Sequence, residues 1–246
     1  MGVKLRFLGC GDAFGTGGRH QTCFLVTHDS GRFLIDCGAS ALIAMRQQGV
    51  APSEIDLVLL SHLHGDHFGG LPFLLLDAQY ASRRTRRLAV AGPPGTEERL
   101  AQLMEASFPG SWQTRWSFDL ELLELEVEER LEVQEVGVTG FEVRHPSGAP
   151  TLALRVEIDG RVVAYSGDTE WVPALTQLSR DADLLIAECY RFEPGVPYHL
   201  NHADLIEHVE ELKTKRIVLT HLGQNALAHF GDLRFDVAED GLELDL

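Results

Sequence analysis

The sequence predicts an α+β fold, an α/β sandwich in which two β-sheets pack face to face and helices cover their outer sides. Segments with strand patterns are numerous in both halves of the 246-residue chain, and helical patterns lie between them. Residues with metal-binding side chains follow predicted apolar strands or precede the next helix, where a scaffold can bring them together. A simple three-layer α/β sheet is the alternative arrangement.

The first third of the chain is predicted to begin as a β-meander. Glycine-rich turns separate short apolar runs, and the predicted strands span 3–8, 22–27, 32–35 and 55–60, with a helix over 39–48. The loop GCGDAFGTGG, 9–18, is not a nucleotide-binding fingerprint, because the apolar, partly β-branched run TCFLVT follows it where such a motif must open a helix. The strand over 55–60 is continuously apolar and therefore expected to be buried.

Helices and strands continue to alternate in the rest of the chain. We predict a helix over 69–80, a strand over 88–91, and a helix from Thr96, as N-cap, to Phe108. The segment 118–136 alternates apolar with acidic residues, which favours half-exposed strands whose glutamates face solvent. Further strands are predicted over 138–144, 151–158, 161–165, 183–187 and 216–220, with a helix over 202–212.

The composition restricts the partners and the location of the protein. A net charge of −16, from 21 basic and 37 acidic residues, disfavours a large nucleic-acid ligand. Four dispersed cysteines fit reduced thiols, the longest apolar runs are too short to span a membrane, and the N-terminus alternates like a strand, so we expect a cytoplasmic protein. The cations Arg83, Arg84, Arg86 and Arg87 are either a phosphate-recognition cluster or part of a solvated loop.

The segment SHLHGDH, 61–67, carries the strongest chemical signal in the chain. It places His62, His64, Asp66 and His67 directly after the buried strand 55–60. Alternate histidines can face one ion, while the turn at Gly65 directs the next two side chains toward a second ion. Imidazole and carboxylate ligands suit zinc and its neighbours. The segment therefore predicts a chelating loop rather than a chance group of surface histidines.

In this segment the sequence resembles the metallo-β-lactamase superfamily, whose signature HxHxDH is matched completely. His145 in VRHPSG, Asp168 in SGDT and His221 in IVLTHLG match the later motifs in order. The resemblance covers nearly the whole chain and implies one domain, 1–246, with the four-layer αββα fold. It further implies two divalent ions per chain, one held by His62, His64 and His145, the other by Asp66, His67 and His221, with Asp168 bridging them.

The resemblance also implies the chemistry of a dinuclear hydrolase. The nucleophile would be metal-bridging hydroxide, and no side-chain nucleophile is assigned. Zinc is the expected metal, although manganese and iron accept the same ligands. Asp36 in LIDCG resembles the buried aspartate that supports the metal loop; a turn residue at a strand end is the alternative.

Within the superfamily, the segments LGCGDAFGTGGRHQTCFLV, GPPGT and HPSGAPTLALRVE resemble ribonuclease Z-like phosphodiesterases. That branch carries a histidine that protonates the leaving oxygen or stabilises the developing phosphorane charge. His199 in HLN matches it, with Asn201 as N-cap, while His202 is the second candidate and Glu188 is a candidate to orient the imidazole. The candidate catalytic residues are thus His199, Glu188 and Asp66.

Two departures from these relatives change the expected substrate. No basic, glycine-rich insertion separates His145 from Asp168, so the tRNA-gripping arm of ribonuclease Z is missing. The closely spaced cysteines of phosphonate-pathway cyclic phosphodiesterases are also missing. We therefore expect a compact phosphodiester substrate and, by analogy with ribonuclease Z relatives, a homodimer. The alternatives are a carbonyl-directed hydrolase such as a lactonase, thioesterase or β-lactamase, and a metal-binding sensor or scaffold without turnover.

Overall fold

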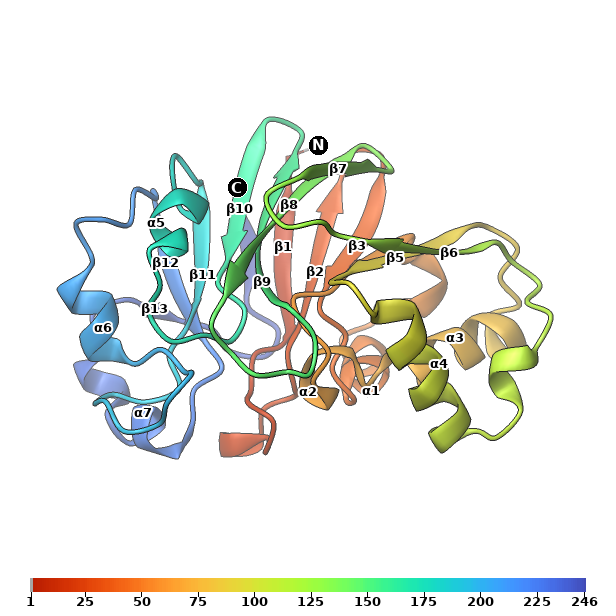
Figure 1. Cartoon of the computed structure of the whole chain (residues 1–246), viewed down its shortest axis with the longest axis horizontal. Helices are drawn as coiled ribbons and strands as arrows, with labels where there is room; N and C mark the ends of the chain where they lie inside the picture. Colours follow the sequence, from red (N-terminus) through yellow and green to blue (C-terminus); the bar gives the residue numbers. More distant parts are fainter. Residues whose placement is uncertain (1) are drawn as a thin grey trace.

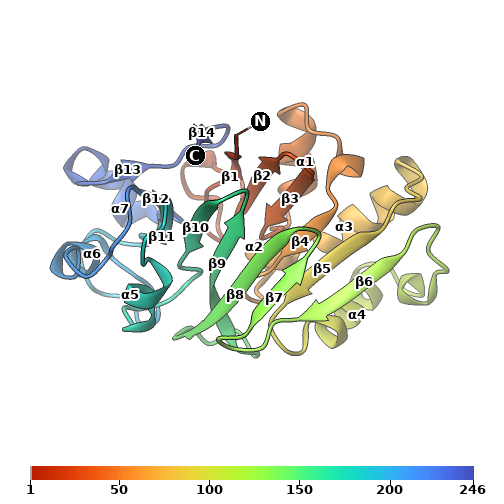
Figure 2. The ribbon, with the colours of Figure 1, turned by 90° about the horizontal axis from the view of Figure 1, so that it is seen from above.

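The computed structural model describes residues 2–246 and contains two seven-stranded sheets packed face to face (Figure 1, Figure 2). The first sheet has the spatial order β14 (Glu243–Asp245), β1 (Lys4–Gly9), β2 (Cys23–His28), β3 (Gly31–Ile35), β4 (Leu57–Leu59), β5 (Leu88–Gly92) and β6 (Leu120–Glu124). The second has the order β13 (Asp236–Val237), β12 (Ile217–Thr220), β11 (Leu184–Glu188), β10 (Arg161–Tyr165), β9 (Thr151–Ile158), β8 (Val136–Val143) and β7 (Arg130–Val133).

Helices cover the outer face of each sheet (Figure 2). The first sheet is covered by α1 (Ala41–Gln47), α3 (Leu71–Leu76) and α4 (Thr96–Ser107), and the second by α5 (Ala174–Leu178), α6 (His202–Glu207) and α7 (Gln224–Ala228). The short helix α2 (Gly65–Phe68) lies at one end of the sandwich. The prediction of two covered sheets is therefore confirmed, and the three-layer alternative is wrong.

The central core fills the space between the two sheets. Phe7 and Phe24 of the first sheet meet Tyr165 of the second, with ring centroids 5.0 and 5.2 Å apart along this row, and all three rings are buried. A further apolar cluster lies between each sheet and the helices that cover it. Because apolar side chains pack on both faces, strands such as β4 and β5 carry no polar side chain.

Strand direction explains why the chemical residues gather at one end of the sandwich. Strands β3 to β6 are parallel in the first sheet, and β10 to β13 are parallel in the second. The segments that follow β4, β8, β10 and β12 carry the predicted metal ligands, at the end of the molecule where α2 lies (Figure 1). Parallel strands end at a common edge, so residues far apart in sequence meet there.

Several predicted boundaries needed correction. Gly95, in a left-handed conformation with φ of 90°, is the N-cap of α4; Thr96 is its first helical residue and donates its hydroxyl to the Pro93 carbonyl at 2.6 Å. The helix predicted over 69–80 is divided into α3 and a π-helical turn, Asp77–Ala81. The helix predicted from 202 ends at Glu207, after which the chain turns. Helices α5 and α7 and strands β13 and β14 are too short to produce a sequence period.

Three of the four clustered arginines make structural contacts. Arg84 is buried and donates to Asp56 at 2.8 Å, Arg86 also pairs with Asp56, and Arg87 pairs with Glu121. These residues precede β5, whereas the histidine motif follows the parallel strand β4, so the two lie at opposite ends of the sheet. This placement favours the loop role over phosphate recognition at the reaction site.

Among the described residues, no helix has the length and apolar character needed to cross a bilayer.

Candidate metal centre and active site

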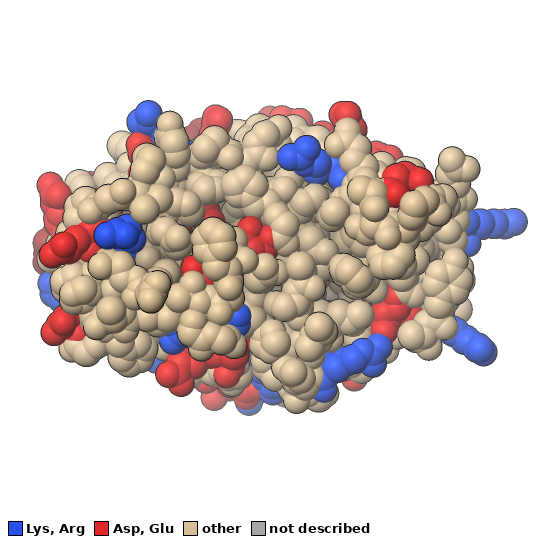
Figure 3. All heavy atoms as spheres, turned by 90° about the horizontal axis from the view of Figure 1, so that it is seen from below, with Lys and Arg blue, Asp and Glu red and all other residues tan. Residues whose placement is uncertain are grey.

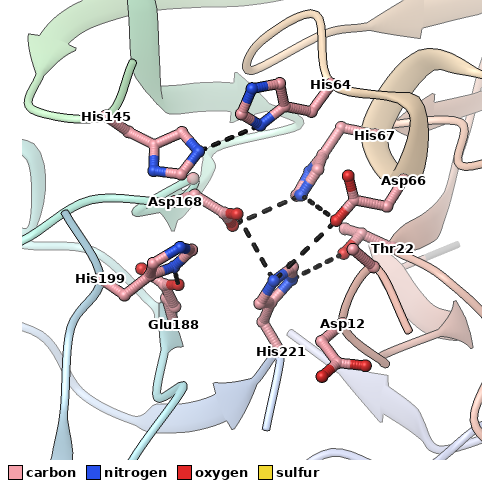
Figure 4. Close-up of polar contacts among 12 residues, drawn as sticks. Asp12, Thr22, His64, Asp66, His67, His145, Asp168, Glu188, His199 and His221 are labelled. Atoms are coloured by element: carbon pink, nitrogen blue, oxygen red, sulfur yellow. Dashed lines mark hydrogen bonds and ion pairs between the residues drawn. The ribbon is translucent and has the colours of Figure 1, made fainter. Parts of the chain in front are cut away.

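The seven predicted ligands converge in two adjoining groups (Figure 4). One consists of His62, His64 and His145, and the other of Asp66, His67, Asp168 and His221; the ligand atoms within each group lie within 4.8 Å of one another. The rings of His62 and His67 are 4.0 Å apart between centroids, which joins the two groups. A third group, formed by Asp168, Glu188, His199 and His221, connects the predicted acid–base residues to the same place.

The local geometry of the motif directs its side chains to both groups. His64, extended with φ of −79° and ψ of 151°, precedes α2, and the first turn of α2 presents Asp66 and His67. The helix is one turn long: the Phe68 amide donates to the His64 carbonyl at 3.0 Å, and the amide of the C-cap residue Gly69 donates to the Gly65 carbonyl at 2.9 Å. An extended residue followed by one helical turn therefore separates the directions of neighbouring side chains, as the two-ion prediction requires.

Asp36 lies behind the metal loop. It is fully buried, and its carboxylate contacts His67 Nδ1 at 2.7 Å and accepts hydrogen bonds from the Ser61 amide and hydroxyl, both at 2.8 Å. Its φ of 57° is left-handed, a conformation that aspartate tolerates better than most residues. The contact holds the His67 ring so that Nε2 points toward Asp66 and Asp168, 3.3 and 3.4 Å away.

Two other histidines are oriented through the ring nitrogen that faces away from their group. His145 Nδ1 contacts the Tyr198 carbonyl at 3.0 Å, which leaves Nε2 3.1 Å from His64 Nδ1. His221 Nδ1 lies 3.4 Å from the Thr22 hydroxyl, and its Nε2 is 3.4 Å from Asp168. Such contacts fix the tautomer and the orientation of metal-binding imidazoles. Thr22 and Tyr198 carry no motif of their own, so these two contacts could not be predicted from the sequence.

The donor atoms fit a divalent cation. Three buried side-chain atoms of this centre, His62 Nε2, His67 Nε2 and Asp168 Oδ1, make no hydrogen bond within residues 2–246, although buried polar atoms are normally paired. They belong to the two groups that present nitrogen and carboxylate oxygen ligands inward. This is the donor set that zinc, manganese and iron accept. The arrangement is a divalent metal site.

The electrostatics of the site are suited to positive charge. Burial lowers the pKa of His62, His64 and His145, which keeps these imidazoles in the neutral, ligating form. Burial opposes ionisation of Asp66, but the adjacent His67 and His221 lower its pKa to about 2.

The pKa of His67 is raised, in contrast to the pKa values of His62, His64 and His145. Burial opposes its protonation, yet Asp168, Asp66 and Asp36 together raise its pKa well above the ordinary value. Three carboxylates around one buried ring produce a negative potential that a cation would neutralise.

The structure also brings His199 and Glu188 together. Glu188 is fully buried, and its carboxylate contacts His199 Nδ1 while accepting the amides of Thr169 and Leu200 at 2.8 and 3.2 Å. Burial opposes protonation of His199, but the hydrogen bond and the charge of Glu188 raise its pKa. Burial and the nearby Asp168 raise the pKa of Glu188.

Helix α6 begins three residues after His199, with Asn201 as its N-cap. Asn201 accepts the Asp204 amide at 3.1 Å and Asp204 accepts the Asn201 amide at 3.2 Å, so the N-cap prediction is confirmed by a capping box. His202 is turned elsewhere: its ring stacks on Phe192, and its Nε2 accepts the Arg234 amide at 3.1 Å. The structure thus places His199, and not His202, at the metal centre.

A cavity of about 150 Å³ opens onto the centre. Figure 3 shows this face of the molecule, with acidic atoms in a central hollow and most basic side chains toward the margins. The cavity is lined by Ala13, Phe14, His64, Asp66, His145, Asp168, Tyr190, His199 and His221. Phe14 and Tyr190 were missed by the sequence analysis. The available signal for Phe14 was a single aromatic residue inside a glycine-rich loop, without a periodic apolar partner.

Comparison with known proteins places these features among metal-dependent hydrolases. Residues 3–236 match the family model described as anti-Pycsar protein Apyc1. Ribonuclease Z of Haloferax volcanii is 26% identical over the whole of this chain and 96% of the relative, and ribonuclease Z of Mycobacterium marinum is 30% identical over 75% of this chain and 69% of the relative. The metallo-β-lactamase fold protein YhfI of Bacillus subtilis superposes with a TM-score of 0.79, at 21% identity over all of both chains.

Proposed function

Because the chain belongs to the family of anti-Pycsar protein Apyc1 and is a ribonuclease Z-like hydrolase of the metallo-β-lactamase fold, we propose that it is a two-metal phosphodiesterase acting on a compact phosphodiester. The observation that carries this proposal is the contact between His199 and Glu188 at the edge of the metal centre. Metal binding alone would not require a buried carboxylate to orient an imidazole that is outside the two main ligand groups. Departure of an alkoxide from phosphate does require a proton donor there.

The metal ligands divide between two ions in this proposal. His62, His64 and His145 would hold one ion, Asp66, His67 and His221 the other, with Asp168 between them. We expect zinc, with manganese and iron as the alternatives that the same donor set accepts. When bound, the two ions supply an activated water at neutral pH and neutralise charge on the phosphoryl oxygens.

The protein side chains would carry the proton transfers. The Glu188 carboxylate is hydrogen-bonded to His199 Nδ1. The other ring nitrogen, Nε2, would therefore face the cavity and donate a proton to the leaving oxygen. The raised pKa of His199 favours the protonated form that this step needs. Asp66, whose pKa is about 2, stays ionised and would accept a hydrogen bond from the attacking water.

The size and charge of the chain support a compact substrate. The cavity is small, and its hollow is acidic, whereas gripping a polynucleotide needs cationic contacts to many phosphates. The alignment with the Haloferax enzyme is 306 positions long, so that relative carries segments with no counterpart here. The chain passes from His145 to Asp168 through β9 and β10 alone, without a protruding arm.

The direct test is metal content together with hydrolysis of bis-p-nitrophenyl phosphate by purified protein, with and without added zinc or manganese. We expect about two ions per chain, the stoichiometry of a two-metal site, and metal-dependent turnover. Two ions with turnover of ester, thioester or lactone substrates alone would contradict the phosphodiesterase proposal and favour carbonyl chemistry. Two ions without any turnover would favour a sensor or scaffold.

Replacing Asp36 by asparagine tests the support behind the metal loop. The variant keeps the size and the tolerance of a left-handed φ, but it weakens the contact with His67 Nδ1. We expect metal affinity to fall about 10- to 100-fold, which is the usual effect of removing a residue that hydrogen-bonds to a metal ligand. Chelator competition measures the affinity. Asp181→Asn, at an exposed position with φ of 56°, is the matched control and should leave it unchanged.

A further inference from the structure

Phe14 is the most exposed large apolar side chain among the described residues, at 81%. It lies in the loop between β1 and β2, which projects past the strand ends at the bottom of Figure 1. Its ring lines the cavity that contains Asp66, His145 and Asp168. Single exposed apolar side chains are common on protein surfaces, so what distinguishes Phe14 is its position at the mouth of the active site.

The loop holds this ring in place. Buried Asp12 accepts the amides of Phe14 and Thr16 at 3.2 and 2.9 Å and the Thr16 hydroxyl at 2.6 Å. The Gln21 side chain donates to the Ala13 carbonyl at 3.0 Å, on the residue before Phe14. Gly15, with φ of 64°, provides the left-handed turn that follows. These contacts fix the backbone around Phe14.

Phe14 stands between two hollows. On one side is the catalytic cavity, and on the other is a wider depression of about 370 Å³ that reaches Ser40 and Ile43 at the start of α1. A second aromatic residue, Tyr190, lines the catalytic cavity, and its ring lies 4.8 Å from the His199 ring. The non-metal walls of the reaction site thus include two aromatic faces, one near the leaving-group histidine and one at the mouth.

We propose that Phe14 and Tyr190 form an aromatic recognition site, so that the preferred phosphodiester carries a planar aryl or heteroaromatic substituent beside its phosphate. This inference rests on the proposed function, because the metal centre is what positions the phosphate. With the phosphate at the metals, the substituents would contact the remaining walls. These are Ala13, Phe14, Tyr190 and His199, of which Phe14 and Tyr190 carry the benzene rings. A planar substituent can stack on such a ring, whereas a small alkyl group covers little of it.

The test compares affinities of three phosphate monoesters for the metal-loaded protein: methyl phosphate, phenyl phosphate and thymidine 5′-monophosphate. Stacking on one aromatic side chain predicts that phenyl phosphate binds about 5- to 100-fold more tightly than methyl phosphate. In Phe14→Ala most of that ratio should disappear while methyl phosphate affinity stays within about twofold, and Phe14→Trp should retain the ratio. Phe230→Ala, which removes another exposed phenylalanine, is the control. A heteroaromatic preference appears as tighter binding of the nucleotide than of phenyl phosphate.

Tyr190 is tested in the same assay. Tyr190→Phe keeps the ring and should keep the ratio, whereas Tyr190→Leu should reduce it. Equal affinities for methyl and phenyl phosphate in the wild type would overturn the inference, as would an unchanged ratio in Phe14→Ala. An unchanged ratio accompanied by a change in molar mass would show instead that Phe14 contacts a second copy of the chain.

Binding and hydrolysis separate the two proposals. If the wild type prefers phenyl phosphate through Phe14 but hydrolyses no phosphodiester, the aromatic site stands and the phosphodiesterase function fails. If it hydrolyses diesters without that preference, the function stands and the aromatic site fails.

Discussion

Asp168→Ala is expected to lower phosphodiester hydrolysis by about three orders of magnitude or more and to reduce the metal bound per chain. Asp168 is buried, belongs to the group with His67 and His221, and has an oxygen that makes no hydrogen bond within residues 2–246. Loss of metal would remove several kcal/mol of transition-state charge stabilisation, and each 1.36 kcal/mol corresponds to a factor of ten in rate. Elemental analysis and steady-state kinetics measure both effects.

The control for this variant is Asp183→Asn, which changes a carboxylate that pairs with Lys215 away from the metal centre. It should keep the metal content and the activity of the wild type. Circular dichroism in the near ultraviolet separates loss of metal from loss of the fold. A folded Asp168→Ala protein with two ions and full activity would contradict the assignment of Asp168 as a shared ligand.

His199→Ala is expected to reduce kcat about 100- to 10,000-fold, the usual contribution of a general acid, with unchanged metal content. The expected loss is greatest for substrates with poor leaving groups, because a nitrophenolate departs readily without a proton. Glu188→Gln should reduce kcat less, since the imidazole remains but its orientation and protonation are less well maintained. Activity toward alkyl and nitrophenyl phosphodiesters, compared in parallel, measures this difference.

Two histidine controls accompany this experiment. His202→Ala removes the other candidate, whose ring stacks on Phe192 instead of lining the cavity, and His208→Ala removes a ring stacked on Trp171. Both should retain activity. Full activity in His199→Ala toward poor leaving groups would contradict the general-acid role, and loss of metal in that variant would indicate a structural role at the centre.

Much of the fold could be read from local patterns. The strands over 151–158 and 161–165 were predicted with their observed bounds, because alternating apolar residues and a turn defined both ends. The helix boundaries were less accurate. Nothing in the residues around Thr96 distinguishes a cap from a first helical residue, since that depends on the left-handed conformation of Gly95.

The candidate site, like the fold, was predicted from the sequence only in part. The chelating loop with His62, His64, Asp66 and His67 could be predicted from its own residues, because chelation needs such side chains close together after a strand. The later ligands were predicted through the resemblance to the motifs of the metallo-β-lactamase superfamily. The sequence could also identify His199 and Glu188 as candidates. It could not choose between His199 and His202, which flank the same helix start and differ only in the direction that the folded loop gives them.

By itself, then, the sequence predicted the class of fold from its strand patterns, and it predicted the ligand set and the hydrolytic chemistry through its resemblance to the metallo-β-lactamase superfamily. Only the tertiary structure decided that Asp36 supports His67, that Arg84 is engaged by Asp56, and that Phe14 and Tyr190 share a cavity. These relationships join segments separated by up to 176 positions. They depend on how two sheets bring their loops together, which no local pattern contains.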